Sequence, residues 1–247
     1  MTVLGALILR VGQKKSVLLI TLAALTLALL VTGFILTFLF HIPPQEKIKH
    51  LKVAIIVSLI VAPLVAYEVV DLLFKINVLE KEMRNFATYD PLTGLFNRRI
   101  FYELTEHQLR VARREKSSVA VMMLDVDEFK KINDSYGHHA GDQTLKSLGK
   151  MISDTVRLSD IAGRLGGDEF IFCLPNTSAE GAKVLANRLI AMVSAFPFIF
   201  EGKQIKVGLS IGVHAQVLDS DYDVSDLFKQ ADLALYEAKR KGKNQVQ

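Results

Sequence analysis

A glycine pair followed by two carboxylates is the stretch whose residue types could do chemistry. Gly166 and Gly167 lie between two apolar runs and precede Asp168 and Glu169. This pattern predicts a strand, a tight turn and a second strand, because glycine adopts positive φ without steric cost. A turn without side chains also lets a large anionic ligand approach the backbone closely. An ordinary solvent-exposed turn can have the same sequence, so the motif alone does not decide its role.

A second acidic segment upstream favours the functional interpretation. Residues 119–124 form a short apolar run typical of a buried strand, and Asp125 and Asp127 follow it. If this strand lies beside the hairpin, Asp125 and Asp168 meet at one edge of the sheet. Two like charges about 4 Å apart repel by about 4 kcal/mol at an effective dielectric constant of about 20. Such a pair needs a proton or a cation, and hard oxygen ligands beside a phosphate-bearing substrate favour Mg²⁺.

The segment Gly166-Gly167-Asp168-Glu169-Phe170 resembles the signature of the GGDEF-domain diguanylate cyclases, enzymes that condense two GTP molecules into cyclic di-GMP and pyrophosphate. The resemblance covers about residues 85–247. Asp90–Arg99 is similar to the motif that opens these domains, and Ala231–Asn244 to the motif that closes them. The resemblance implies an α+β fold, the palm-like fold of nucleotidyl cyclases, with an antiparallel sheet flanked by helices in the order β-α-α-β-β-α-β-α.

The sequence pattern also predicts where the principal elements lie. Asn97 is positioned to cap the helix that follows it. The glycines near residue 210 indicate that a strand there is approached closely by another backbone. We expect helices at 98–115, 179–195 and 224–241, a further helix that ends near 156, and a strand at 206–213.

The resemblance implies a metal site and a catalytic role for the acidic residues. The implied ligands of Mg²⁺, or alternatively Mn²⁺, are Asp125, the backbone carbonyl of Val126, and Asp168. Asp168 is also the inherited candidate for the general base, and Glu169 is expected to support the catalytic site. Since a metal-bound carboxylate is a weak base, the metal role of Asp168 is the better founded.

The implied substrate is GTP, bound through its guanine edge and its phosphates. An aspartate accepts hydrogen bonds from guanine N1–H and N2–H, and an asparagine both donates and accepts. The implied substrate-binding residues are Lys130, Asn133, Asp142, Gly166, Gly167, Lys239 and Lys243.

Simpler interpretations of three of these residues stay open. Asp142 could be a helix-start residue, and Lys239 and Lys243 could be a solvated basic helix end. Lys243 keeps the charge of the arginine more common in relatives but lacks its bidentate geometry. A metal site formed by His138 and His139 is disfavoured, because adjacent helical side chains diverge by about 100°.

Arg157 and Asp160, five residues before the glycine pair, resemble the family's inhibitory product site, and Arg188 matches a further arginine of that site. Arginine can stack on guanine and pair with phosphate. Cyclic di-GMP is therefore the implied feedback ligand. A local ion pair between residues 157 and 160 at a helix end is the alternative. A non-catalytic cyclic di-GMP receptor acting through Arg157 and Asp160 is the alternative function.

The N-terminal third of the 247-residue chain contains two long apolar runs, at about 16–40 and 53–74. About 20 apolar residues cross a bilayer, and the first run is too long for a cleaved signal peptide. A short turn is expected at 41–50, and Pro63 is expected to kink the second helix. We therefore predict a two-helix transmembrane hairpin within residues 1–75.

The distribution of basic residues predicts the orientation of that hairpin. The basic residues on the outer sides of the two apolar runs are Arg10, Lys14, Lys15, Lys75, Lys81 and Arg84. They outnumber the basic residues of the loop between the runs, which are Lys47, Lys49 and Lys52. The positive-inside rule then places both termini in the cytoplasm. This predicts a multi-pass protein of the inner (cytoplasmic) membrane, in contact with lipid, with its catalytic domain in the cytoplasm.

Residues 76–89 are expected to connect the membrane helices to the catalytic domain, 90–247. Alternating spacings of four and three, typical of a coiled-coil seam, separate the apolar residues Leu72, Ile76, Leu79, Met83 and Phe86. An amphipathic helix packed on its own domain or on the membrane is the alternative. A homodimer also follows from the implied reaction, since each domain would hold one GTP.

The charge distribution argues against a nucleic-acid-binding protein, and the cysteine content excludes an intrachain disulfide. The net charge is +4, but no dense block of Lys and Arg indicates a nucleic-acid partner. Cys173 is the single cysteine, so an intrachain disulfide is impossible, and it is expected to be a small buried hydrophobic residue.

Overall fold

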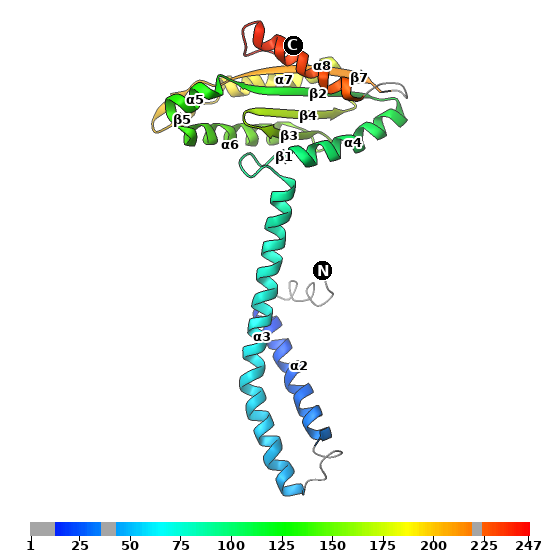
Figure 1. Ribbon diagram of the computed structural model, residues 1–247, viewed down its shortest axis with the longest axis vertical. Helices are drawn as coiled ribbons and strands as arrows, with labels where there is room; N and C mark the ends of the chain where they lie inside the picture. The colour runs from blue at the N-terminus through cyan, green and yellow to red at the C-terminus, as the bar shows by residue number, and fades with distance from the viewer. Residues whose placement is uncertain (1–12, 36–42, 219–223) are drawn as a thin grey trace. The chain divides into compact units, whose positions relative to one another are not determined.

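The computed structural model describes residues 13–35, 43–218 and 224–247 (Figure 1). By the contacts between its residues, the chain divides into two compact units that adjoin between Arg84 and Asn85. The expectations for Arg10 and for residues 36–42, including the end of the first apolar run, lie outside the described residues.

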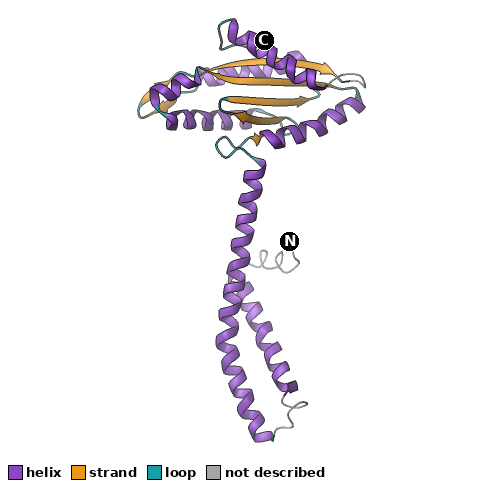
Figure 2. Ribbon diagram, in the orientation of Figure 1, coloured by secondary structure: helices purple, strands orange, loops and turns teal. Residues whose placement is uncertain are grey.

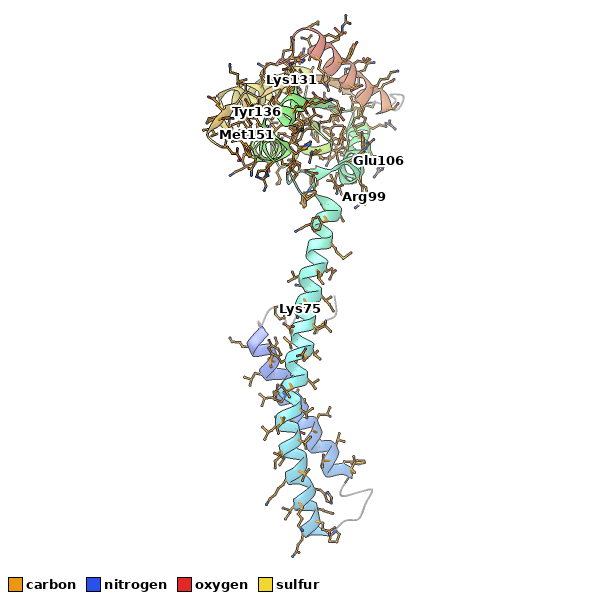
Figure 3. All side chains as sticks on the ribbon, turned by 60° about the vertical axis from the view of Figure 1, so that its left-hand side comes forward. Lys75, Arg99, Glu106, Lys131, Tyr136 and Met151 are labelled. Carbon is orange, nitrogen blue, oxygen red and sulfur yellow. The ribbon has the colours of Figure 1, made fainter. Side chains whose placement is uncertain are left out.

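Two long apolar helices make up the described part of the first unit. Helix α2 is Gln13–Phe34, and α3 is Pro44–Thr88, which contains Pro63 and extends into the second unit. By length and composition both are able to cross a membrane. Most of their described apolar side chains are exposed, as Figure 3 illustrates, although Ala66 and Val70 of α3 are buried.

The expected turn at 41–50 was wrong for most of its length, and the expected second span and helical connector belong to one helix, α3. Helix α3 begins at Pro44, so the expected turn at 41–50 is largely helical, and the helix continues without a break through residues 53–74 and 76–88. Proline is well tolerated at the start of a helix. The helical period is also the same in a membrane span and in a coiled coil, so nothing in the pattern ends the helix at the boundary between them.

A five-stranded sheet forms the centre of the second unit (Figure 2). Its order is β1-β3-β4-β2-β7. The strands are β1 Phe96–Asn97, β2 Ser118–Asp127, β3 Ile161–Gly166, β4 Glu169–Pro175 and β7 Gly208–Val217. A further two-stranded sheet, β5 Phe198–Phe200 with β6 Lys203–Ile205, was not predicted.

The large sheet is mixed, which corrects the expectation of an antiparallel one. Strand β2 pairs antiparallel with β4 and β7, and β3 pairs antiparallel with β4, but β1 pairs parallel with β3. Between β1 and β3 the chain forms three helices and strand β2. Such a crossover connection allows two strands to run in the same direction.

Helices cover both faces of the sheet. They are α4 Arg98–Glu115, α5 Phe129–Tyr136, α6 His138–Thr155, α7 Ala179–Ala195 and α8 Val224–Arg240. Alternate residues of β2 enter two hydrophobic clusters: Met122 and Leu124 pack with α5, α6 and α7, whereas Val119 and Val121 pack with α4 and α8. Cys173 is fully buried in the second cluster, as expected, and burial raises the pKa of its thiol to about 12.

Asn97 caps α4 as expected and also contacts the last turn of α3. Its Oδ1 accepts the backbone N–H of Ile100 at 3.1 Å, and its Nδ2 donates to the carbonyl of Ala87 at 3.0 Å. Arg99 donates to the same carbonyl at 2.9 Å. One asparagine therefore joins the end of one helix to the start of the next.

Gly212 of β7 allows α8 to lie directly on the sheet, as the glycines of this strand indicated. A Cβ at this position would lie 2.1 Å from the backbone nitrogen of Leu235 and 2.2 Å from the carbonyl oxygen of Ala231. Both atoms belong to the backbone of α8, so neither can move away by a change of rotamer.

We expect Gly212→Ala to lower the free energy of unfolding by about 3 kcal/mol, because the added methyl forces α8 off the sheet. The matched control is Gly181→Ala in α7, where the new Cβ would lie 3.2 Å from a side-chain methyl of Thr177. The control should change stability by less than about 1 kcal/mol. Chemical unfolding of the detergent-solubilised chain measures both, and equal effects would contradict the packing argument.

Candidate functional site

The two acidic segments meet where β2 ends and β4 begins, at one end of these neighbouring strands, as the sequence predicted. The β2–β4 register places Asp125 opposite Glu169, and the N–H of Val126 donates to the carbonyl of Asp168 at 3.3 Å. Directly opposed residues of an antiparallel pair share a face of the sheet, so Asp125 and Glu169 lie on one face. We call Asp125, Asp168 and Glu169 the acidic edge.

The predicted glycine turn joins β3 to β4 beside this edge. Gly166 and Gly167 have φ of +146° and +54°, in the range that favours glycine, and both are exposed. No atom lies within 4 Å of a Cβ built on either residue. The backbone of the turn is therefore open to a ligand.

Asp125 carries a negative charge in an unfavourable place. Burial raises the pKa of its carboxyl above the ordinary value, and the charges of Asp168 and Glu169 raise it further. Lys239 of α8 opposes this shift, with its Nζ 2.7 Å from Asp125 Oδ2, but does not cancel it. The edge therefore has negative charge that its own lysine leaves partly uncompensated.

The acidic edge has the donor atoms that suit Mg²⁺. Among the described residues, no group of three His, Cys, Asp or Glu side chains is arranged to hold a metal ion. Mg²⁺ usually binds through one or two carboxylates together with water and substrate phosphates, so it does not need such a group. The carboxylates of Asp125 and Asp168 and the carbonyl of Val126 are oxygen donors of the kind that such an ion takes.

The lysines proposed as phosphate contacts lie near this edge and pair with carboxylates. Lys239 pairs with Asp125, and Lys243 Nζ lies 3.0 Å from Glu128 Oε1. Lys131 also pairs with Glu128, at 2.9 Å. Lys130 is exposed on α5. Lys239 and Lys243 are thus directed toward the end of β2 and do not form a purely solvated helix end.

Asn133 and Asp142, the expected guanine-binding residues, lie on neighbouring helices. Gly141 allows Asn133 to approach α6, because a Cβ on Gly141 would lie 2.0 Å from Asn133 Oδ1. Asp142 is exposed and lies beyond the first turn of α6, which begins at His138 and contains no acidic residue. The alternative that Asp142 is a helix-start residue is therefore wrong.

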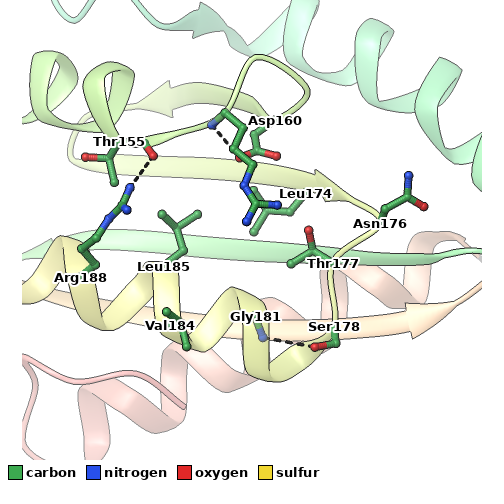
Figure 4. A pocket seen from close by; sticks show the side chains of 11 residues that line it. Thr155, Asp160, Leu174, Asn176, Thr177, Ser178, Gly181, Val184, Leu185 and Arg188 are labelled. Carbon is green, nitrogen blue, oxygen red and sulfur yellow. Dashed lines mark hydrogen bonds between the residues drawn. The ribbon is translucent and has the colours of Figure 1, made fainter.

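A separate pocket contains the three residues expected at the product site (Figure 4). Arg157, Asp160 and Arg188 line a cavity of about 390 Å³ between the segment 155–160, the end of β4 and the first half of α7. Arg188 donates to the carbonyl of Thr155 at 2.6 Å, and Asp160 accepts the backbone N–H of Arg157 at 2.8 Å. Asp160 thus binds the backbone of Arg157 and not its guanidinium, contrary to the ion-pair alternative.

Arg164 and Asp90 are site residues that the sequence analysis missed. Arg164 donates from Nε and Nη2 to the carbonyl of Gly167, at 3.0 and 2.7 Å, and from Nη1 to Asp90 Oδ1 at 3.0 Å. Asp90 also accepts the N–H and hydroxyl of Thr93 at 2.8 and 2.7 Å. This network ties the turn that opens the domain to the glycine turn. Its sequence signals were a basic residue just before the glycine pair and an aspartate at the start of the opening motif, and neither indicated that the two residues pair.

Comparison with known proteins agrees with this geometry. The family model described as "Diguanylate cyclase, GGDEF domain" matches residues 87–245. The chain is 37% identical over 167 residues to diguanylate cyclase DgcP of Pseudomonas aeruginosa, with 68% of this chain and 25% of DgcP covered. It is 38% identical over 168 residues to diguanylate cyclase A of Treponema denticola, with 67% of this chain and 45% of that relative covered. The chain thus spans less than half the length of both relatives.

A solved structure is similar as well. The coiled coil and GGDEF domain of DgcB from Caulobacter crescentus, in complex with c-di-GMP, superimposes with a TM-score of 0.65 at 25% sequence identity. The alignment covers 72% of this chain and 94% of that chain.

We expect Asp90→Asn to destabilise the fold by about 1–2 kcal/mol near neutral pH, because it weakens the bonds to Arg164 and Thr93. Burial raises the pKa of Asp90, but the hydrogen bonds from Thr93 and Arg164 outweigh it, so the net pKa is lowered from 3.8. The stabilisation is therefore complete above pH 3.8 and is lost as the pH falls through the lower folded-state pKa.

Chemical unfolding of the wild type and the variant at several pH values measures this difference. Asp134→Asn, at an exposed position of α5, is the control and should show no such pH dependence. A difference between wild type and Asp90→Asn that stayed constant below pH 3.8 would argue against the ionised pair.

Proposed function

Since this chain belongs to the GGDEF-domain family of diguanylate cyclases, we propose that it condenses two GTP molecules into cyclic di-GMP and pyrophosphate. The observation that carries this proposal is the acidic edge. Buried and exposed carboxylates, two lysines and a glycine turn without side chains meet where β2 ends and β4 begins. Such a place suits a polyphosphate and a divalent cation.

The residues of the acidic edge have different roles in the proposed reaction. Asp125, the carbonyl of Val126 and Asp168 would hold Mg²⁺ or Mn²⁺, which when bound neutralises the triphosphate and stabilises departing pyrophosphate. Glu169, opposite Asp125 in the register, supports this site. Asp168 is the candidate that accepts the proton of the attacking hydroxyl.

The substrate-binding residues surround the same edge. Asn133 and Asp142, on α5 and α6, bind the guanine edge, and Gly166 and Gly167 let the phosphates approach the backbone. Lys130, Lys239 and Lys243 compensate the phosphate charge. Both Lys239 and Lys243 already lie within 3.0 Å of carboxylates at the end of β2, so they are close enough to exchange these partners for phosphate oxygens.

The reaction requires two copies of the domain. The ribose 3′-hydroxyl of one GTP attacks the α-phosphorus of the other, the bond to pyrophosphate breaks, and the hydroxyl proton passes to the base. A second, reciprocal step closes the ring. Because one acidic edge would hold one GTP, two edges must face each other. We therefore propose a homodimer, in which residues 76–89, including the last turns of α3, control how the two domains meet.

We further propose that the enzyme is anchored in the inner membrane by α2 and α3, with its catalytic domain in the cytoplasm. The exposure of the apolar side chains on both helices supports contact with lipid. GTP and Mg²⁺ are cytosolic, which agrees with this orientation.

Cyclic di-GMP is the proposed ligand of the pocket that contains Arg157, Asp160 and Arg188. Two guanidinium groups and a carboxylate at one cavity suit a ligand with phosphates and a guanine edge. The pocket supports product feedback. A receptor without catalysis would use the same pocket but would leave the acidic edge without a function.

We expect Asp125→Asn and Asp168→Asn to lower the rate of cyclic di-GMP synthesis by at least about 100-fold, because each removes a carboxylate from the proposed metal site. Asp232→Asn, on an exposed part of α8, is the matched control and should retain activity. The assay uses the detergent-solubilised chain with GTP and Mg²⁺. If the wild type bound cyclic di-GMP but made none, even when dimerised artificially, the receptor function would be favoured over catalysis.

We expect Arg157→Ala to weaken cyclic di-GMP binding by about tenfold or more, since it removes one of the pocket's two guanidinium groups. Titration calorimetry measures the binding, and initial rates with added product measure the loss of inhibition. The initial rate without product should stay near the wild-type value, because the pocket is separate from the acidic edge. Arg114→Ala, an exposed position near the end of α4, is the control. Unchanged product affinity in Arg157→Ala would place cyclic di-GMP elsewhere.

A further inference from the structure

Asp127 is the carboxylate of the predicted acidic segment that the proposed reaction does not use. It ends β2 and, by the alternation of a strand, shares a face of the sheet with Asp125. Both of its oxygens are engaged. Oδ1 accepts the hydroxyl proton of Ser210 at 2.6 Å, and Oδ2 accepts the backbone N–H of Asn244 at 2.8 Å. Ser210 is fully buried, so the position of this carboxylate is fixed.

The second of these bonds holds a turn of unfavourable conformation. Gly242, Lys243 and Asn244 follow α8 with φ of +118°, +63° and +45°. The left-handed region costs a residue such as lysine about 1 kcal/mol or more. The turn persists because bonds from other elements hold it. Besides the bond to Asp127, Asn244 Oδ1 accepts the N–H of Leu209 at 3.4 Å.

The chain beyond the turn is also fixed, along β7. The N–H of Ile211 donates to the carbonyl of Gln245 at 3.0 Å, and the N–H of Gln247 donates back to Ile211 at the same distance. Val213 donates to Gln247 at 2.9 Å. The turn is thus held between the end of α8 and a short strand-like tail, and Asp127 joins it to β2.

This turn carries or adjoins the lysines of the acidic edge. Lys243 lies within it and pairs with Glu128, and Lys239 lies in the last turn of α8 and pairs with Asp125. If the bond from Asn244 to Asp127 were lost, Lys243 could relax from its left-handed conformation. Its ammonium group would then leave the end of β2.

We propose that Asp127 is a positioning residue for GTP binding, which acts through the backbone of Asn244 to hold Lys243, and with it Lys239, at the phosphate side of the acidic edge. This inference rests on the proposed function. The triphosphate is charged before the reaction begins, so loss of a positioned lysine weakens ground state and transition state alike. Such a loss raises KM and leaves kcat nearly unchanged.

The test uses the detergent-solubilised chain with Asp127→Asn. The amide oxygen can still accept from Ser210, but the amide NH₂ would meet the N–H of Asn244, and two donors cannot bond. We expect KM for GTP to rise about tenfold while kcat changes less than threefold. The affinity for a non-reacting GTP analogue should fall by the same tenfold. Amide hydrogen exchange of residues 243–247 should accelerate at least tenfold, with no change in β3 and β4.

Ser210→Ala is the matched control, because it removes the other hydrogen bond of the same carboxylate and leaves the bond to Asn244. It should lower stability but change KM less than twofold. Asn244→Ala breaks the bond to Leu209 and disfavours the left-handed turn, so it should reproduce the rise in KM. It provides a second route if Asp127→Asn folds poorly.

An unchanged KM and analogue affinity in both Asp127→Asn and Asn244→Ala would overturn the proposal, whether or not exchange accelerates. An equal rise in KM in Ser210→Ala would also overturn it, by showing that the effect is a general loss of stability. If the wild type made no cyclic di-GMP, the proposed function would fail. Analogue binding and hydrogen exchange would then still decide the role of Asp127.

Discussion

The antiparallel pairing of β2 with β4 is the constraint on which the site depends. Its register places Asp125 opposite Glu169 and brings the backbone of Val126 to Asp168. A shift by one residue would turn every side chain of β2 to the other face. Because both faces of β2 are buried by helices, such a shift is strongly disfavoured. The fold can therefore hold three acidic residues together although they repel one another.

The surrounding structure compensates this repulsion only in part. Lys239 pairs with Asp125, yet the pKa of that carboxyl stays raised by burial and by the neighbouring charges. Arg164 fixes the glycine turn, and Asp127 fixes the turn after α8. Each of these contacts joins segments that are distant in the sequence. The site is thus a small area in which several elements are tied to the end of one strand and the charges of neighbouring carboxylates are only partly compensated.

The sequence allowed the hairpin, β2, α4, α6, α7 and α8 to be predicted, because apolar periodicity and glycine placement are local signals. It did not reveal β5 and β6, which are three residues each, or the parallel pairing of β1. The bond between Arg164 and Asp90 was missed because it joins residues 74 apart, and no local pattern reports such a contact. The same reason hid the role of Asp127. Its type was noticed, but its partners are known only from the fold.

The contact between Gly141 and Asn133 ties the close approach of α5 and α6 to the position of one amide side chain. A Cβ at position 141 would lie 2.0 Å from Asn133 Oδ1, so a larger residue there would force the amide of Asn133 out of its present position. The amide that we propose binds the guanine edge thus keeps its place because the facing helix has no side chain at this position.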